Sequence, residues 1–330
     1  MQGGNFIVTD SDRIPSVFAA YVMFFIAVLG RELTGLLTNG LYFLFSFLVP
    51  GLGTGFVNGL SSFIYYGLFI LVPFALYASR HPGMSEYIRI KPLDGRSALL
   101  CAVAAPVGVL LAAQLTCFWM MLIEAVGGKI TGNDILVPEA IGGKLSMVLT
   151  SALLPAVCEE LLMRGCMLTS REEKGSARAI VLTALWFTAL HASVEGIPAE
   201  LMCGLILGFM AVVTDSIFAG MIYHFVHNSV VLIITFAQGP AAEEAAVSTF
   251  NAVGGFAGCF MMALECLILG AIMFYLLRAL LRRHASENIG KPPVEGAEKS
   301  FSVYAVAACC VIFVLLEYAL DILSVAGVVR

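Results

Sequence analysis

Long apolar runs separated by short polar loops make up most of this chain. The candidate runs are Pro15–Leu37, Val57–Ala78, Ala98–Val126, Leu145–Leu168, Ala179–Ala192, Glu200–Val213, Phe218–Phe236, Phe256–Leu281 and Phe301–Val328. A helix that spans a bilayer needs about 20 predominantly apolar residues. The pattern therefore predicts an all-α fold, a polytopic transmembrane helical bundle with about eight or nine spans.

Two parts of this pattern are irregular. Arg31 and Glu32 interrupt the first run, and a further apolar piece, Leu41–Val49, follows it. One long tilted helix and a helix followed by a re-entrant segment both fit this arrangement. The fifth and sixth runs are short, which indicates helices partly buried among the others.

Composition agrees with a membrane protein. Of the 330 residues, 60% are hydrophobic and 12% are charged, whereas soluble domains contain about 25% charged residues. The few basic residues are scattered over short loops, which argues against a nucleic-acid partner. Nine cysteines lie in or beside apolar runs without a CxxC pair, so we expect them to act as small hydrophobic residues.

Loop charge predicts the orientation of the spans. Basic residues follow the second and fourth runs and surround the polar stretch 284–300, at Arg80, Arg89, Lys91, Arg96, Arg171, Lys174, Arg178, Arg278, Arg282, Arg283, Lys291 and Lys299. Alternating spans place these loops on one side, which the positive-inside rule makes cytoplasmic. We divide the chain into N-terminal spans (1–140), a central part (141–238) and C-terminal spans with a short polar linker (239–330, linker 284–300).

The central part begins with a pair of adjacent glutamates. Charged side chains inside a bilayer cost about 2.5–3.5 kcal/mol on insertion scales, so they tend to serve function. Glu160 and Arg164 are four residues apart, share one helix face and can pair. Glu159 is rotated about 100° from Glu160 and is free to act as a general base. The alternative is that both glutamates pair with basic groups at a helix end.

Two histidine motifs follow. Phe187 and His191 are four residues apart, and so are His224 and Asn228. An imidazole and an amide on one helix face can donate hydrogen bonds to one developing oxyanion. A lone membrane histidine is more often a helix-contact residue than a catalyst, but the two motifs together favour chemistry. His227, beside Asn228, is interpreted as a neighbour without a direct role.

The order Glu-Glu-x-x-x-Arg, Phe-x-x-x-His and His-x-x-x-Asn on successive membrane helices resembles the CPBP family. That family comprises CAAX prenyl proteases and Abi membrane proteins for bacteriocin processing or self-immunity. The resemblance covers roughly Leu145 to Phe236. Between the second and third motifs, the spacing of Gly204 and Gly208 fits close helix packing.

The resemblance implies a glutamate-dependent intramembrane endopeptidase with a CAAX-protease-like catalytic core at 141–238. Glu159 would activate water, His191 would help to hold it, and His224 with Asn228 would stabilise the oxyanion. Glu160, Arg164 and Phe187 would support this site. The implied substrate is a peptide or membrane-protein segment, with or without a lipid. From helix depth and loop charge, we expect a site in the plasma membrane that opens toward the cytoplasm.

Several alternatives remain open. Zinc is the candidate cofactor, with Glu159, His191 and His224 as its ligands, but the chain contains no HExxH motif and we expect no obligatory metal. A non-enzymatic role in bacteriocin self-immunity or protein tethering would retain the motifs as a polar core. A proton-coupled transporter would use Glu159, His191 and Glu265, yet no internal repeat supports it. The isolated acids Glu124, Glu265, Glu317 and Asp321 are interpreted as groups that form interhelical hydrogen bonds or lie at the membrane interface, with proton or ion coupling as the alternative.

Overall fold

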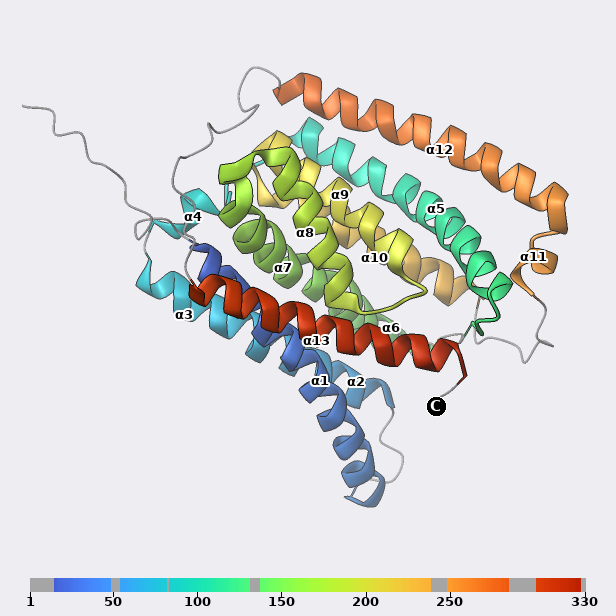
Figure 1. Cartoon of the computed structure of the whole chain (residues 1–330), viewed down its shortest axis with the longest axis horizontal. Helices are drawn as coiled ribbons and strands as arrows, with labels where there is room; N and C mark the ends of the chain where they lie inside the picture. Colours follow the sequence, from blue (N-terminus) through green and yellow to red (C-terminus); the bar gives the residue numbers. More distant parts are fainter. Residues whose placement is uncertain are drawn as a thin grey trace, which may run out of the picture.

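The computed structural model describes residues 15–48, 54–81, 83–130, 137–238, 248–284 and 301–327. These residues form helices joined by short connections, without strands, which confirms the all-α prediction (Figure 1). Eight helical runs are long and apolar enough to cross a membrane, and α8 (Ser176–His191) is a shorter apolar helix. The predicted count of eight or nine spans is therefore confirmed. Residues 285–300 of the predicted linker lie outside the described residues.

The helical elements follow the predicted runs. They are α1 (Val17–Leu48), α2 (Thr54–Ile64), η2 (Tyr65–Leu71), α3 (Val72–Arg80), α4 (Met84–Tyr87), α5 (Gly95–Ala125), α6 (Ile141–Val148), η3 (Leu149–Leu153), α7 (Leu154–Glu160), η4 (Leu161–Leu168), η5 (Thr169–Lys174), α8, α9 (Ile197–Thr214), α10 (Ile217–Gln238), α11 (Thr249–Ala252), α12 (Gly255–His284) and α13 (Phe301–Val325).

The first helix is continuous through its charged interruption. Of the two arrangements that fit the sequence, the structure contains the single long helix α1. Arg31 forms an ion pair with Glu317 of α13, with 2.6 Å between Nη2 and Oε2, and donates a hydrogen bond to the carbonyl of Leu190 in α8. A charge that would be costly in lipid is thus neutralised by a partner from the last helix.

The run that carries the glutamate pair changes its helical pitch. π-Helical turns, η3 and η4, flank the short α-helix α7. Pro155 stands at the start of α7 and has no backbone N–H, so the regular hydrogen-bond ladder cannot pass through it. π-Helical turns are rare and often mark functional sites. Here they rotate the side chains that precede and follow Glu159 and Glu160.

α8 and α9 form a closely packed hairpin. A Cβ atom at Gly204 would lie 2.8 Å from the Cα of Ala184, and one at Gly208 would lie 3.1 Å from the Cγ2 of Ile180. The backbones can approach this closely only because both positions are glycine, which confirms the close packing predicted from their spacing. α8 ends where Ala192 adopts a left-handed conformation with φ of 49°.

One end of the bundle, which we call the basic end, contains Arg89, Lys91, Arg171, Arg178 and Arg283. α12 returns to α5 there, because Arg283 lies 2.8 Å from Asp94. The turn between α9 and α10 is also held at this end, since the amide of Ile217 donates to the carbonyl of Arg89 at 2.9 Å. With the pairing of Arg89 and Glu172, these contacts place the described residues of the predicted basic loops at one end of the bundle.

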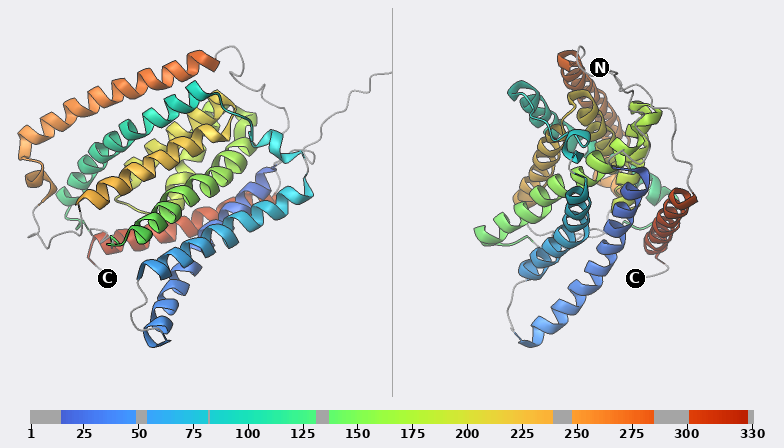
Figure 2. Two further views of the ribbon diagram at one scale, coloured as in Figure 1. Left: turned by 180° about the vertical axis from the view of Figure 1, so that it is seen from behind. Right: turned by 90° about the vertical axis from the view of Figure 1, so that its left-hand side faces the viewer.

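The opposite end contains the start of α2 and the end of α10. There the amide of Lys129 donates to the carbonyl of Val325 at 2.7 Å, and Glu124 accepts hydrogen bonds from Thr249. Figures 1 and 2 show the second half of α1 and α2 diverging from the other helices toward this end. Lys129 and Lys144 are its basic residues within the described part of the chain.

The isolated acids form the predicted contacts between separate parts of the chain. Glu265 contacts Gln114, and Asp321 accepts a hydrogen bond from the amide of Val194 at 2.6 Å. With Glu124 and Glu317 above, all four acids therefore make contacts between separate elements. All nine cysteines are free thiols.

Candidate active site

The predicted site residues surround a cavity of about 630 Å³ between the N-terminal helices and the central part of the chain. Glu159 from α7, Phe187 and His191 from α8, and His224 and Asn228 from α10 all line it. The volume lies within the range of small-molecule and peptide pockets. The structure thus brings together the four residues expected to carry the chemistry.

Glu159 is 5% exposed, and its two oxygens differ in their surroundings. Oε1 accepts a hydrogen bond of 2.9 Å from the hydroxyl of Tyr66. Oε2 is buried and has no hydrogen-bond partner among the described residues. Such an orphaned acceptor is costly in a folded protein unless water or a ligand fills the gap. Oε2 is therefore the oxygen that can accept a proton from a bound water.

Glu160 and Arg164 lie behind the cavity wall. Glu160 and Arg164 are both fully buried, and Arg164 Nη1 donates to Glu160 Oε1 at 2.9 Å. Arg164 also donates to the carbonyl of Gly204 at 3.1 Å and lies 4.6 Å from the centre of the Phe187 ring. The predicted pair is present, and it connects η4 with both helices of the α8–α9 hairpin.

The same glutamate orients one of the histidines. Glu160 Oε1 lies 3.0 Å from Nδ1 of His224. A carboxylate only accepts hydrogen bonds, so Nδ1 of His224 carries the proton. Gly220, one turn earlier on α10, leaves room for this carboxylate, since a Cβ there would lie 2.6 Å from Glu160 Oε2. The Glu160 contact fixes the ring and leaves Nε2 for the cavity.

His191 is held by its own helix. Its Nδ1 lies 2.9 Å from the carbonyl oxygen of Phe187, which fixes the proton on Nδ1 by the same argument. The rings of Phe187 and His191 meet edge to face, with centroids 4.8 Å apart. Nε2 of a neutral His191 can therefore accept a hydrogen bond from a water molecule and hold it in place.

Asn228 stands at the same wall as His224. Its Nδ2 donates to the carbonyl of Ser151 at 3.2 Å, and the amide has a second N–H that this bond does not use. His227 also lines the cavity. Its ring stacks on Tyr223 and its Nε2 lies 3.7 Å from the sulfur of Cys203, as expected for a neighbour of the site.

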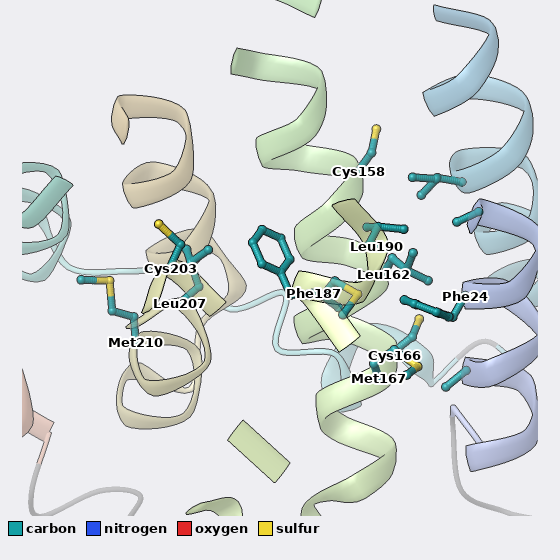
Figure 3. Packing of buried hydrophobic residues seen from close by; sticks show 14 of the residues in the cluster. Phe24, Cys158, Leu162, Cys166, Met167, Phe187, Leu190, Cys203, Leu207 and Met210 are labelled. Carbon is teal, nitrogen blue, oxygen red and sulfur yellow. The ribbon is translucent and has the colours of Figure 1, made fainter. Parts of the chain in front are cut away.

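Phe187 joins the site to the hydrophobic core. Figure 3 shows its ring between Cys203 and Leu207 of α9 on one side and Leu162 and Met167 of η4 on the other. The aromatic ring thereby separates the buried Arg164 from the cavity.

Two lining residues were not found from the sequence. Tyr66 comes from the π-helical η2, far from the motifs along the chain, and Glu200 comes from the first turn of α9. Glu200 Oε2 is buried without a hydrogen-bond partner in the described part of the chain. Glu200 could have been found as an acid at the start of the sixth apolar run, whereas no pattern signals Tyr66.

The donor set does not fit a metal ion. In the described residues, no three His, Cys, Asp or Glu side chains lie close enough together to hold one. The proposed zinc ligands Glu159, His191 and His224 line the cavity without forming such a group, although Oε2 of Glu159 and Nε2 of both histidines are not used by the contacts described above. We derive no chemical step through a metal.

Comparison with known families points in the same direction as this geometry. Residues 141–230 match the family model Rce1-like, described as type II CAAX prenyl endopeptidase Rce1-like. No curated protein and no solved structure matches the chain. The matched stretch contains all three motifs and agrees with the resemblance to the CPBP family. The chain is an integral, multi-pass membrane protein that contains an Rce1-like domain of a membrane protease family.

Proposed function

We propose that this protein is an intramembrane endopeptidase that hydrolyses a peptide bond with a glutamate-activated water. The observation that supports this function best is that Glu159, His191, His224 and Asn228, from three different helices, line one cavity. The orphaned Oε2 of Glu159 and the two Nδ1-anchored histidines give each residue a distinct role.

The reaction uses these residues in sequence. Water binds between Glu159 and Nε2 of His191, and Glu159 removes its proton as the oxygen attacks the carbonyl carbon of the scissile bond. The carbonyl oxygen becomes an oxyanion, which accepts hydrogen bonds from Nε2 of His224 and from the amide of Asn228. To donate from both nitrogens His224 must be cationic, and Glu160 stabilises that charge. The C–N bond then breaks, and the leaving amine takes the proton held by Glu159.

The partners follow from this reaction. The substrate is a peptide or a membrane-protein segment, with or without an attached lipid, in the plasma membrane. No obligatory metal is proposed, because no three candidate ligands among the described residues lie close enough together to hold one. Chelation with EDTA or 1,10-phenanthroline should therefore leave cleavage by the purified protein unchanged, and lost activity that zinc restores would contradict this.

The test compares membrane-associated peptides and protein termini in cells that carry wild type, Glu159→Gln or Glu265→Gln. Glu265 is a matched control because it is a glutamate inside a membrane helix that contacts Gln114 and not the cavity. We expect new termini with wild type and with Glu265→Gln, and none with Glu159→Gln at equal abundance.

Identical termini from wild type and Glu159→Gln, with both proteins folded and equally abundant, would end the proposed mechanism. The non-enzymatic hypothesis, a membrane protein for self-immunity or tethering, would then be favoured, because it retains function without the carboxylate.

A further inference from the structure

The cavity is closed toward the basic end. Its lining residues on that side are Leu207, Tyr223 and His224, which are 1%, 0% and 6% exposed. Beneath them lie the buried side chains of Leu162, Met163 and Met167. Figure 3 shows part of this packed layer, with side chains from α7–η4, α8 and α9.

An ion network with three buried members, Arg89, Glu172 and Asp215, lies beyond that layer. Arg89 is 2% exposed, pairs with Glu172 and lies 3.1 Å from Asp215 through its Nε. Lys91 also pairs with Asp215, and the hydroxyl of Ser216 donates to the carbonyl of Lys91 at 2.6 Å. The segment before α5, η5 and the α9–α10 turn are thus joined across this end by contacts between charged side chains.

The cavity is open toward the opposite end. Its lining residues on that side include Gly35, Asn58, Ser151 and His191, all of which are exposed. They come from the second half of α1, the start of α2, η3 and the end of α8. The divergence of α1 and α2 from the other helices leads to the same end (Figures 1 and 2).

The outer wall suits an extended polypeptide. Ser62 and Thr150 line it, and each hydroxyl donates to a carbonyl four residues earlier on its own helix, whereas the hydroxyl of Ser61 already accepts a hydrogen bond from Thr38. A hydroxyl whose hydrogen is used in this way still has an acceptor lone pair. The oxygens of this wall can therefore accept hydrogen bonds from the backbone N–H groups of an extended peptide.

The sidedness of this opening follows from loop charge. The positive-inside rule places the basic end in the cytoplasm. We propose that the cavity receives its substrate from the non-cytoplasmic side, as an extended peptide or the juxtamembrane segment of an exported protein. This reverses the expectation that the site opens toward the cytoplasm, which rested on the depth of Glu159 and His191 and not on which end is closed. The identity of the occupant as a substrate rests on the proposed function, whereas the direction of opening does not.

The test measures thiol accessibility in the full-length protein. Ser151→Cys places a thiol at the opening, and Ser85→Cys is the matched control, because Ser85 is an exposed serine of α4 at the basic end. Cells that express each variant are treated with a membrane-impermeant maleimide before and after permeabilisation. Wild type treated in parallel gives the labelling of the nine native cysteines.

We expect Ser151→Cys to be labelled equally before and after permeabilisation, and Ser85→Cys only after it. Labelling of Ser151→Cys only after permeabilisation would overturn the proposal. This readout needs no catalysis, so it separates the direction of opening from the proposed function. Where wild type produces new termini, they should map to non-cytoplasmic segments.

Discussion

The hydroxyl of Tyr66 holds one oxygen of the Glu159 carboxylate, and the other oxygen has no partner among the described residues. A general base works best when the atom that takes the proton is fixed and the rest of the group is occupied. Tyr66 is therefore a positioning residue for Glu159, supplied by the N-terminal spans and not by the matched domain.

Removing that hydroxyl should slow the reaction without unfolding the protein. Hydrogen bonds to charged groups contribute about 1.5–3 kcal/mol, so Tyr66→Phe should lower kcat about 10- to 100-fold with a smaller change in KM. The control is Tyr65→Phe, since Tyr65 lines the same wall and its ring contacts Tyr66. Equal loss in both variants of the purified protein would show that the hydroxyls serve packing and not Glu159.

The two adjacent glutamates should differ sharply in their effect on stability. Glu160→Ala leaves Arg164 buried and unpaired, which typically costs about 3–5 kcal/mol. Glu159→Ala removes only the hydrogen bond to Tyr66, together with a carboxylate oxygen that has no partner among the described residues, so it should cost less, about 1.5 kcal/mol. Thermal unfolding in one detergent would compare them. Similar midpoints would contradict the assignment of Glu160 to structure and Glu159 to chemistry.

The sequence could predict only the local part of this site. The pairing of Glu160 with Arg164 follows from their four-residue spacing, and the separate direction of Glu159 follows from the helix period. Tyr66 could not be predicted, because it reaches Glu159 across 93 positions and belongs to no motif. The contact between Glu160 and His224 was missed for the same reason, since nothing local reveals which helices face each other.

At the scale of elements, the α8–α9 hairpin depends on a glycine. Gly204→Ala would place a methyl group 2.8 Å from the Cα of Ala184, against backbone that cannot rotate away. Overpacking of this kind typically costs about 1–3 kcal/mol, and the displaced hairpin would move His191. Gly270→Ala in α12 is the control, because a Cβ there meets nothing within 4 Å. A Gly204→Ala protein as stable and active as Gly270→Ala would contradict this packing.

The start of α5 is fixed by Asp94. Its carboxylate accepts hydrogen bonds from the amides of Ser97 and Arg96 and lies 2.8 Å from Arg283. Asp94→Ala should lower the free energy of unfolding by about 0.5–2 kcal/mol. Asp94→Asn keeps the cap and should lower it by only about 0.3 kcal/mol.

This contribution should depend on pH in a defined direction. Hydrogen bonds from Ser97, followed by the charge of Arg283, lower the pKa of Asp94 to about 2. A lowered pKa means that the stabilisation is complete above the ordinary value of about 4 and is lost as the pH falls through about 2. The difference in unfolding midpoint between wild type and Asp94→Ala should therefore shrink below pH of about 4. A constant difference would show that the charge contributes nothing.

The sequence predicts where the membrane helices lie, but it does not predict how they bend or which partners they contact. Each predicted apolar run corresponds to a helix, because length and hydropathy alone decide whether a segment can cross a bilayer. The partner of Arg31 in α1 is Glu317 of the last helix, and no local pattern identifies it. The π-helical turns around α7 depend on Pro155 and on the packing of its neighbours, which no hydrophobic pattern reports.

For the whole molecule, the direction of opening depends on which end of the bundle is sealed. Helix depth placed Glu159 and His191 at similar levels, but depth gives no information on the packed layer below His224 or on the ion network at Arg89. Both arise from contacts between segments distant in the chain, such as Arg89 with Asp215. The three predicted parts stay a prediction, although the cavity has walls from both the first and the second part.

The first and last helices are coupled to the core through Arg31 and Glu317, and a double-mutant cycle should detect this coupling. Arg31→Met leaves Glu317 unpaired between helices, so it should lower the free energy of unfolding by about 3–5 kcal/mol. Glu317→Met should cost less, because Arg31 keeps Glu32, whose Oε1 lies 3.1 Å from its Nε. The double variant replaces the pair by apolar side chains and should lie closer to wild type than Arg31→Met, because a well-packed apolar substitute for a buried pair is often neutral. Arg178→Met, an exposed charge at the basic end, is the control and should change stability by less than about 0.5 kcal/mol. Thermal unfolding of the four proteins in one detergent measures the cycle. Strictly additive losses would mean that the two charges act independently and that α13 is not held to α1 by this pair.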